Sequence, residues 1–177
     1  MPSLPPVVTA DLSGKTVAVI GSNTGIGLEA AKHFARMKPA RLICTCRNQA
    51  KADATVSIIE QETGYTKAES WVLELSEFTS VIAFANRFEE EGIPLDILVC
   101  NAAVALASYQ KTSDGCETVA VMKTLNEEGS FCDPEKRYSD SKLLNVLFTR
   151  AIAHHIGPKA PVIVDTVNPG FCVSDLR

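Results

Sequence analysis

The residues whose chemistry is clearest are Tyr138 and Lys142, which stand four positions apart in the segment Tyr-Ser-Asp-Ser-Lys. They open an apolar run with helical periodicity. Positions i and i+4 share one face of a helix, so the phenol and the ammonium can reach one small site. A phenol with a pKa of about 10 transfers protons poorly at neutral pH unless its phenolate is stabilised. Because a neighbouring ammonium stabilises a phenolate, the pair predicts general acid/base chemistry.

A glycine-rich segment near the N-terminus is the second candidate site, and it reads Gly21-Ser22-Asn23-Thr24-Gly25-Ile26-Gly27. It follows a short β-branched run and precedes a helical pattern. Glycines at such a turn let a pyrophosphate approach the N–H groups of a helix N-terminus. The spacing differs from the G-x-G-x-x-G fingerprint, and a turn that only connects two elements is the alternative. The strand–turn–helix context favours nucleotide binding.

The residues after the second predicted strand indicate which dinucleotide would bind. An Asp or Glu about twenty residues beyond the glycines usually holds the ribose 2′-hydroxyl of NAD. Here the chain reads Cys46-Arg47-Asn48, and the next carboxylate is Asp53. Arg47 can pair with a 2′-phosphate, which favours NADP (NADPH) over NAD; an ordinary surface arginine is the alternative.

Composition excludes several classes of protein. The chain has 177 residues, 46% of them apolar, which is typical of one ordinary globular domain. A net charge of −4 implies no general attraction to nucleic acid or to acidic membranes. The N-terminus lacks the pattern of a signal peptide, and no apolar run reaches the ~18–20 residues of a membrane span. We therefore expect a soluble, cytoplasmic protein.

The cysteines point to a reducing compartment and to no metal site. No two of them form a C-x-x-C pair, and no His-rich segment accompanies them. Cys44 and Cys46 would share one face of a strand, a spacing poorly suited to a mutual disulfide. We interpret them as reduced thiols rather than as a disulfide framework. The set is Cys44, Cys46, Cys100, Cys116, Cys132 and Cys172.

Strand and helix patterns alternate along the chain. After an irregular lead-in over residues 1–13, we expect a single nucleotide-binding domain over 14–177. Predicted strands cover 16–20, 41–46, 71–75, 95–100 and 161–167, and predicted helices cover 25–37, 48–62, 76–91 (with Ser76 as N-cap) and 137–156. Repeated alternation of this kind predicts an α/β fold with a doubly wound parallel sheet.

The motifs together resemble the short-chain dehydrogenase/reductase family over nearly the whole chain. The glycine turn, Asn101-Ala102-Ala103, Tyr-x-x-x-Lys and Pro169-Gly170 occur in that family's order. Cys-Arg-Asn after the second strand, and the segments 141–148 and 168–172, are similar to its retinol-dehydrogenase-like branch. The surroundings of Asn126 and Tyr138 resemble fungal members that act in secondary-metabolite biosynthesis. The resemblance implies a Rossmann-type sheet and an NADP-dependent interconversion of an alcohol and a carbonyl compound. It also implies a homo-oligomer, since members of the family often assemble in this way.

The resemblance also implies individual roles. Tyr138 would donate or accept the proton, and Lys142 would bind the nicotinamide ribose hydroxyls and stabilise the phenolate. Arg47 would hold the 2′-phosphate, and Ser174 would meet the carboxamide. The other cofactor-binding residues would be Gly21, Asn23, Gly25, Ile26, Gly27, Glu74 and Asn101.

One departure from the family pattern bears on catalysis. Only twenty residues separate Glu117 from Tyr138, so the fifth strand, which carries the family's catalytic serine, is predicted to be missing, as is the final strand. Ser130 is the one serine of that interval and lies in a polar stretch. The alternative function is therefore a catalytically impaired remnant that only binds a nucleotide or pairs with another subunit.

Overall fold

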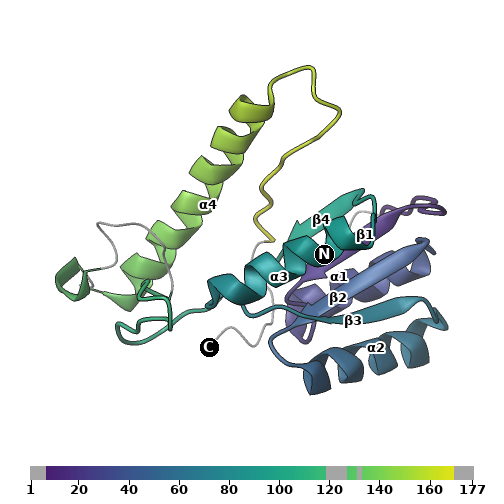
Figure 1. The fold of residues 1–177 in the computed structure, drawn as a ribbon, viewed down its shortest axis with the longest axis horizontal. Helices are drawn as coiled ribbons and strands as arrows, with labels where there is room; N and C mark the ends of the chain where they lie inside the picture. The colour runs from purple at the N-terminus through teal and green to yellow at the C-terminus, as the bar shows by residue number, and fades with distance from the viewer. Residues whose placement is uncertain (1–6, 119–126, 131–132, 170–177) are drawn as a thin grey trace, which may run out of the picture. The chain divides into compact units, whose positions relative to one another are not determined.

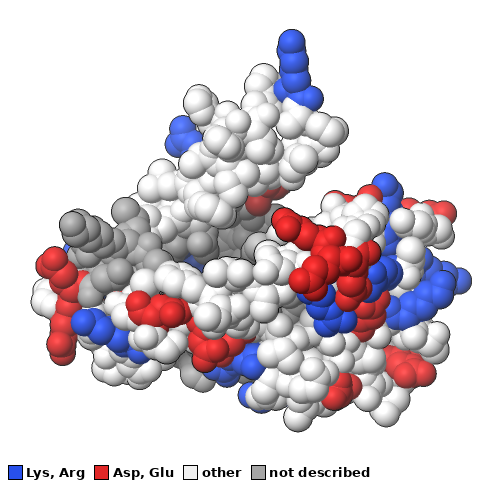
Figure 2. Space-filling model, in the orientation of Figure 1, with Lys and Arg blue, Asp and Glu red and all other residues white. Residues whose placement is uncertain are grey.

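The structure, a computed structural model, describes residues 7–118, 127–130 and 133–169. The chain divides into two compact units, Met1–Ala102 and Ala103–Arg177, and each is described by itself. The single domain expected over 14–177 stays a prediction. On the face shown in Figure 2, acidic and basic side chains are interspersed, in keeping with the small net charge.

Unit 1 is built on a four-stranded parallel sheet (Figure 1). Its strands are β1 (Thr16–Ile20), β2 (Arg41–Cys46), β3 (Ala68–Val72) and β4 (Ile97–Cys100), in the order β3-β2-β1-β4. All five residues of β1 are buried, as expected for a central strand of a parallel sheet covered on both faces. The chain leaves β1 toward β2 and later returns to its other side as β4, so the predicted doubly wound α/β fold is confirmed.

Three helices cover the two faces of this sheet: α1 (Gly25–Arg36), α2 (Gln49–Thr63) and α3 (Phe78–Glu90). Alternate residues of a strand point to opposite faces. Val17 and Val19 accordingly pack in a cluster with residues of α1 and α2, whereas Ala18 packs in a second cluster with Trp71 and with Phe84 of α3. The sheet therefore has α1 and α2 on one face and α3 on the other.

The third strand and the helix after it differ from the prediction. β3 begins at Ala68 rather than at Trp71, because its residues pair in register with β2 from Leu42↔Ala68 to Cys46↔Val72. Helix α3 begins at Phe78, and Ser76 is not its N-cap. The Ser76 hydroxyl instead donates to Glu74 Oε1 at 2.7 Å. A strand's ends are set by its partner, which local composition does not reveal.

Unit 2 contains the long helix α4 (Pro134–Ile156) and a short 3₁₀ turn, η1 (Glu128–Ser130). α4 begins three residues before the predicted start at 137, because Asp133 Oδ1 accepts a hydrogen bond from Glu135 N at 2.7 Å and Pro134 suits the first helical position.

The strand predicted over 161–167 is wrong, since the structure gives these residues no regular secondary structure. Val162 is 58% exposed and Ile163 is 95% exposed. A β-branched run becomes a strand only through a ladder with a neighbour. In the described part of unit 2, the β-pairing is limited to the isolated bridge between Lys111 and Glu117. Across the described residues, no helix has both the length and the apolar character to cross a bilayer.

Candidate functional site

The glycine turn connects the carboxyl end of β1 to the first residue of α1. Gly21 has φ of 79° and Gly25 has φ of 55°, in the left-handed region that favours glycine. A Cβ on Gly21 would lie 2.8 Å from Ala102 Cα, and a Cβ on Gly27 would lie 2.1 Å from the Gly21 carbonyl oxygen. Gly21 therefore lies so close to the segment after β4, and Gly27 so close to the turn, that a side chain at either position would collide with backbone.

Asn101, directly after β4, holds this turn from the neighbouring strand. Its Nδ2 donates to the Gly21 carbonyl oxygen at 2.9 Å. The backbone N–H groups of Asn101 and Ala102 both donate to the Ile20 carbonyl, at 3.2 and 2.9 Å. The resemblance implied that Asn101 lies beside a cofactor ribose; the observed contact is one that fixes the shape of the turn.

Two further residues hold the turn, and the sequence analysis missed both. The Gly21 N–H donates to Thr45 Oγ1 at 3.2 Å. The Ser22 N–H and hydroxyl both donate to the Thr45 carbonyl oxygen, at 3.1 and 3.2 Å. Ser22 and Thr45 are almost completely buried. The sequence did offer one signal, because Thr45 stands near the end of a largely apolar strand. A buried hydroxyl there needs a hydrogen-bond partner.

Arg47 and Glu74 follow the carboxyl ends of β2 and β3. Arg47 is exposed and, within the described residues, belongs to no ion pair. Glu74 Oε1 accepts hydrogen bonds from the backbone N–H and the hydroxyl of Ser76, at 2.9 and 2.7 Å. The Glu74 N–H donates to Ser80 Oγ at 2.9 Å. Glu74 thus shapes the loop before α3.

The predicted cofactor residues of unit 1 consequently gather at one edge of the sheet. In a parallel sheet the carboxyl ends of neighbouring strands lie together, and ligands bind where the strand order reverses. Here the order reverses between β1 and β4, where the glycine turn and Asn101 meet. The residues at this edge are Gly21, Asn23, Gly25, Ile26, Gly27, Arg47, Glu74 and Asn101.

Tyr138 and Lys142 lie on one face of α4, as their spacing predicted. Lys142 Nζ is 4.9 Å from the centre of the Tyr138 ring, within the range of a cation–π contact. Both side chains are partly buried, and burial lowers the pKa of the Lys142 ammonium. The Ser141 hydroxyl donates to the Tyr138 carbonyl oxygen at 2.7 Å. The ammonium is therefore held beside the phenol ring within one turn of helix.

Two serines remain among the candidates. Ser130 ends the 3₁₀ turn η1 and is not part of a strand. Ser174 lies outside the described residues.

Comparison with known proteins gives a family match. The family model described as short chain dehydrogenase matches residues 15–131. The WW domain-containing oxidoreductase of Homo sapiens is 32% identical over 206 aligned positions, which cover 90% of this chain and 49% of that protein. Retinol dehydrogenase 12 of Mus musculus is 32% identical over 203 positions, covering 93% of this chain and 64% of that one. The chain thus spans about half of the first relative and about two-thirds of the second.

The fold has solved counterparts. One is a protein of Escherichia coli CFT073 that is assigned to the short chain dehydrogenases and was solved in complex with NADPH. It is 20% identical and superposes with a TM-score of 0.59, covering 82% of this chain and 73% of that one. At this identity the likeness concerns the fold alone.

Proposed function

The chain belongs to the short-chain dehydrogenase family, and from that premise we propose that it is an NADP-dependent oxidoreductase that interconverts an alcohol and a carbonyl compound. The proposal rests on one observation. The glycine turn, held by the hydrogen bond from Asn101 to the Gly21 carbonyl, lies at the point where the strand order reverses. Bound NADP would supply the hydride chemistry at nicotinamide C4.

Unit 1 is suited to the phosphates of a dinucleotide. Gly21 and Gly27 let the turn pack closely against Ala102 and Asn101, and the N-terminus of α1 opens directly at the turn. Hydrogen bonds from the turn to Thr45 already fix its shape, so little reorganisation would accompany binding. Arg47 would pair with the 2′-phosphate, which favours NADP over NAD. A protein with this fold was solved in complex with NADPH, so the fold accommodates that cofactor.

Tyr138 and Lys142 would supply the proton chemistry. The proposal has Tyr138 donate the proton to a carbonyl oxygen or accept it from an alcohol. Lys142, 4.9 Å from the ring centre, would stabilise the phenolate and hold the ribose hydroxyls. The partial burial of Lys142 supports this role, because a charge partly removed from water interacts more strongly with a neighbouring anion. Without a second hydrogen-bond donor to the substrate oxygen, turnover would fall by about 10²–10³.

A second function is favoured by the short segment that precedes Tyr138 in unit 2. Only twenty residues lie between Glu117 and Tyr138, and their described part contains a 3₁₀ turn rather than a strand. The family's serine has no evident counterpart there. The chain could then bind the nucleotide without turnover, as a nucleotide-binding or pairing subunit.

One experiment separates these functions. NADPH is titrated while its fluorescence is followed, with NADH as comparator and with Arg47→Gln and Lys51→Gln as variants. We expect Arg47→Gln to weaken the binding of NADPH but not of NADH, and Lys51→Gln, a charge loss in the first turn of α2, to change neither. A panel of ketones and aldehydes is then assayed with the wild type and Tyr138→Phe. Oxidation of NADPH that depends on Tyr138 supports the oxidoreductase proposal. Binding of NADPH without its oxidation supports the catalytically impaired alternative. If NADPH does not bind, both proposals are contradicted.

Four finer parts of the proposal come from the sequence alone. The cysteine pattern suggests a cytoplasmic location. The surroundings of Tyr138 suggest a substrate of secondary-metabolite biosynthesis. The long helices of the family suggest a homo-oligomer, and Ser174 would meet the nicotinamide carboxamide.

A further inference from the structure

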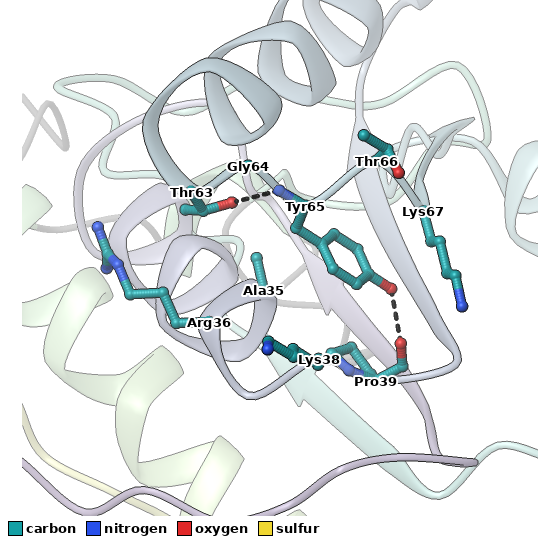
Figure 3. A pocket seen from close by; sticks show the side chains of 9 residues that line it. All are labelled: Ala35, Arg36, Lys38, Pro39, Thr63, Gly64, Tyr65, Thr66 and Lys67. Atoms are coloured by element: carbon teal, nitrogen blue, oxygen red, sulfur yellow. Dashed lines mark hydrogen bonds between the residues drawn. The ribbon is translucent and has the colours of Figure 1, made fainter.

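A hollow of about 350 Å³ lies at the amino edge of the unit 1 sheet, opposite the glycine turn (Figure 3). It forms where α1 ends before β2 and where α2 ends before β3. Pro39 and Tyr65 are buried beneath it, and the cations Arg36, Lys38 and Lys67 line it. We call this site the basic hollow. None of the proposed cofactor residues belongs to its lining.

The basic hollow is positively charged, whereas the chain as a whole is negatively charged. The protein carries a net charge of −4, yet three cations and no Asp or Glu are found among the described residues that line the hollow. Arg36 lies in the last turn of α1, where a cation also suits the helix dipole. Lys38 adjoins the same helix end, but Lys67 lies three residues beyond the C-cap of α2, so the dipole does not account for Lys67.

Lys38 is placed where the backbone favours glycine. Its φ is 55°, and no other non-glycine residue in the described ranges has a positive φ. Its N–H donates to the Ala35 carbonyl at 3.0 Å, closing the end of α1 in the way that glycine usually does. The chain thus carries a long cation at the rim of the hollow despite a conformational cost.

The floor of the hollow is rigid. The Tyr65 hydroxyl donates to the Pro39 carbonyl at 2.9 Å, and the Tyr65 N–H donates to Thr63 Oγ1 at 3.2 Å (Figure 3). Burial raises the pKa of Tyr65 to about 12, so its ring stays a neutral surface at physiological pH. In the view of Figure 3 the ring lies between the side chains of Arg36 and Lys67. A neutral aromatic floor with a cationic rim suits a ligand that is apolar at one end and anionic at the other.

We propose that the basic hollow binds a small organic anion, with a phosphate or sulfate group at the rim cations Lys38 and Lys67 and an apolar part against Tyr65. Ammonium groups attract such anions as point charges, and a preformed floor lowers the ordering cost of binding. The site is separate from the glycine turn, so it does not depend on the proposed dehydrogenase function.

The test is a titration of the full chain with phenyl phosphate, phenyl sulfate and inorganic phosphate, followed by amide chemical shifts. We expect shifts at Lys38, Thr66 and Lys67, and tighter binding of the phenyl esters than of inorganic phosphate. The preference between the two esters distinguishes phosphate from sulfate ligands. Shifts confined to residues 21–27, or absent altogether, would overturn the proposal.

Substitutions make the test specific. Lys38→Gly removes a rim charge but suits the positive φ, so we expect at least wild-type thermal stability and about tenfold weaker phenyl phosphate binding. Lys67→Gln should weaken binding similarly. Lys51→Gln removes the same charge from an exposed position on α2 and should leave binding unchanged. Equal weakening by all three variants would show diffuse charge attraction only and would contradict a built site.

Discussion

Gly27 is the residue at which the packing of the candidate site is tightest. A Cβ there would lie 2.1 Å from the Gly21 carbonyl oxygen and 2.5 Å from Asn101 Nδ2. Gly27→Ala should therefore push α1 away from the turn and lower the free energy of unfolding by about 2–3 kcal/mol, as overpacking does. Urea denaturation measures this loss, and NADPH titration should show a parallel loss of affinity.

The matched control is Gly129→Ala, since nothing lies within 4 Å of a Cβ built on Gly129. That variant should unfold within ~0.5 kcal/mol of the wild type, as most surface substitutions do. If Gly27→Ala proved equally neutral, the close packing of the turn described above would be incorrect.

For single residues, the sequence predicts which residues within one segment lie close together better than it predicts hydrogen bonds between distant segments. The glycine spacing and the Tyr-x-x-x-Lys pair identified Gly21, Gly27, Tyr138 and Lys142 correctly as neighbours within their own segments. The hydrogen bonds from Gly21 and Ser22 to Thr45 were missed. They join residues more than twenty positions apart, and such a pairing depends on strand register, which a single sequence does not state.

Elements are joined on one face of the sheet by an ion-pair network. Arg41 of β2 binds Glu69 of β3 through two bonds, of 2.6 and 2.7 Å, and reaches Glu91 after α3 at 3.0 Å. Arg87 binds Glu91 at 2.7 Å, and its guanidinium lies 3.7 Å from the centre of the Trp71 ring. The network thus ties the end of α3 to two strands.

This network predicts a pH dependence. The hydrogen bonds from Arg41 lower the pKa of the Glu69 carboxyl below its ordinary value of 4.5. A carboxyl whose folded pKa is lowered stabilises the fold above its unfolded pKa, and that contribution is lost as pH falls through the folded pKa. Glu69→Gln should therefore cost at most about 1 kcal/mol at pH 7, and the difference from the wild type should shrink below pH 4.5.

Urea denaturation at a series of pH values between 3 and 7 measures the effect, at about the ionic strength of cells. Glu90→Gln, at the exposed end of α3 and without an ion pair among the described residues, is the control. A difference between Glu69→Gln and wild type that stayed constant across this range would argue against the network as the source of the stability.

The start of α4 depends on its cap. Asp133 Oδ1 accepts hydrogen bonds from Glu135 N at 2.7 Å and from Lys136 N at 3.3 Å. Asp133→Ala should destabilise the first turns of α4 by about 1 kcal/mol, whereas Asp133→Asn should retain most of the cap. Amide exchange of residues 134–142 reports the effect, because Tyr138 and Lys142 lie in these turns. Identical exchange in both variants would mean that tertiary contacts, and not the cap, fix the helix start.

Element prediction succeeded where the pattern is local and failed where it depends on a partner. Helices α1 and α2 begin and end within a residue or so of the prediction, because the glycine turn, the Asn48 cap and Gly64 mark their ends. β3 was displaced because Ala68, Glu69 and Ser70 carry no strand pattern and are held by β2. The segment 161–167 has a strong strand pattern, yet it forms no strand without a ladder partner.

The two units differ in how much apolar surface they bury. Among the described residues, every buried hydrophobic side chain lies between Leu12 and Leu73, in unit 1. In the part of unit 2 that the structure describes, the buried residues are Glu117 and Arg137. Helix α4 meanwhile exposes Leu143, Leu147 and Phe148. Because burial of apolar surface is the main source of stability, unit 1 should be the more stable unit.

The comparisons agree with a chain that lacks an internal segment. The alignment with the human relative runs over 206 positions, whereas the chain has 177 residues, so that relative contains residues with no counterpart here. The motif order predicts that such a gap lies between Glu117 and Tyr138. The sequence does not predict how the loss changes the packing. A missing segment leaves the remaining motifs unchanged, but it changes which surfaces of the fold are covered.

Unequal stability predicts the order in which the molecule opens. In native-state hydrogen exchange, amides of β1 and β2 should exchange only through global unfolding, and amides of α4 through local opening, about 100-fold faster or more. Equal protection of the strands and α4 would contradict the assignment of the core to unit 1. NADPH extends the test: it should slow exchange at residues 21–27 under either proposed function. Only if Tyr138 and Lys142 act on the bound cofactor should it also slow exchange in the first turns of α4.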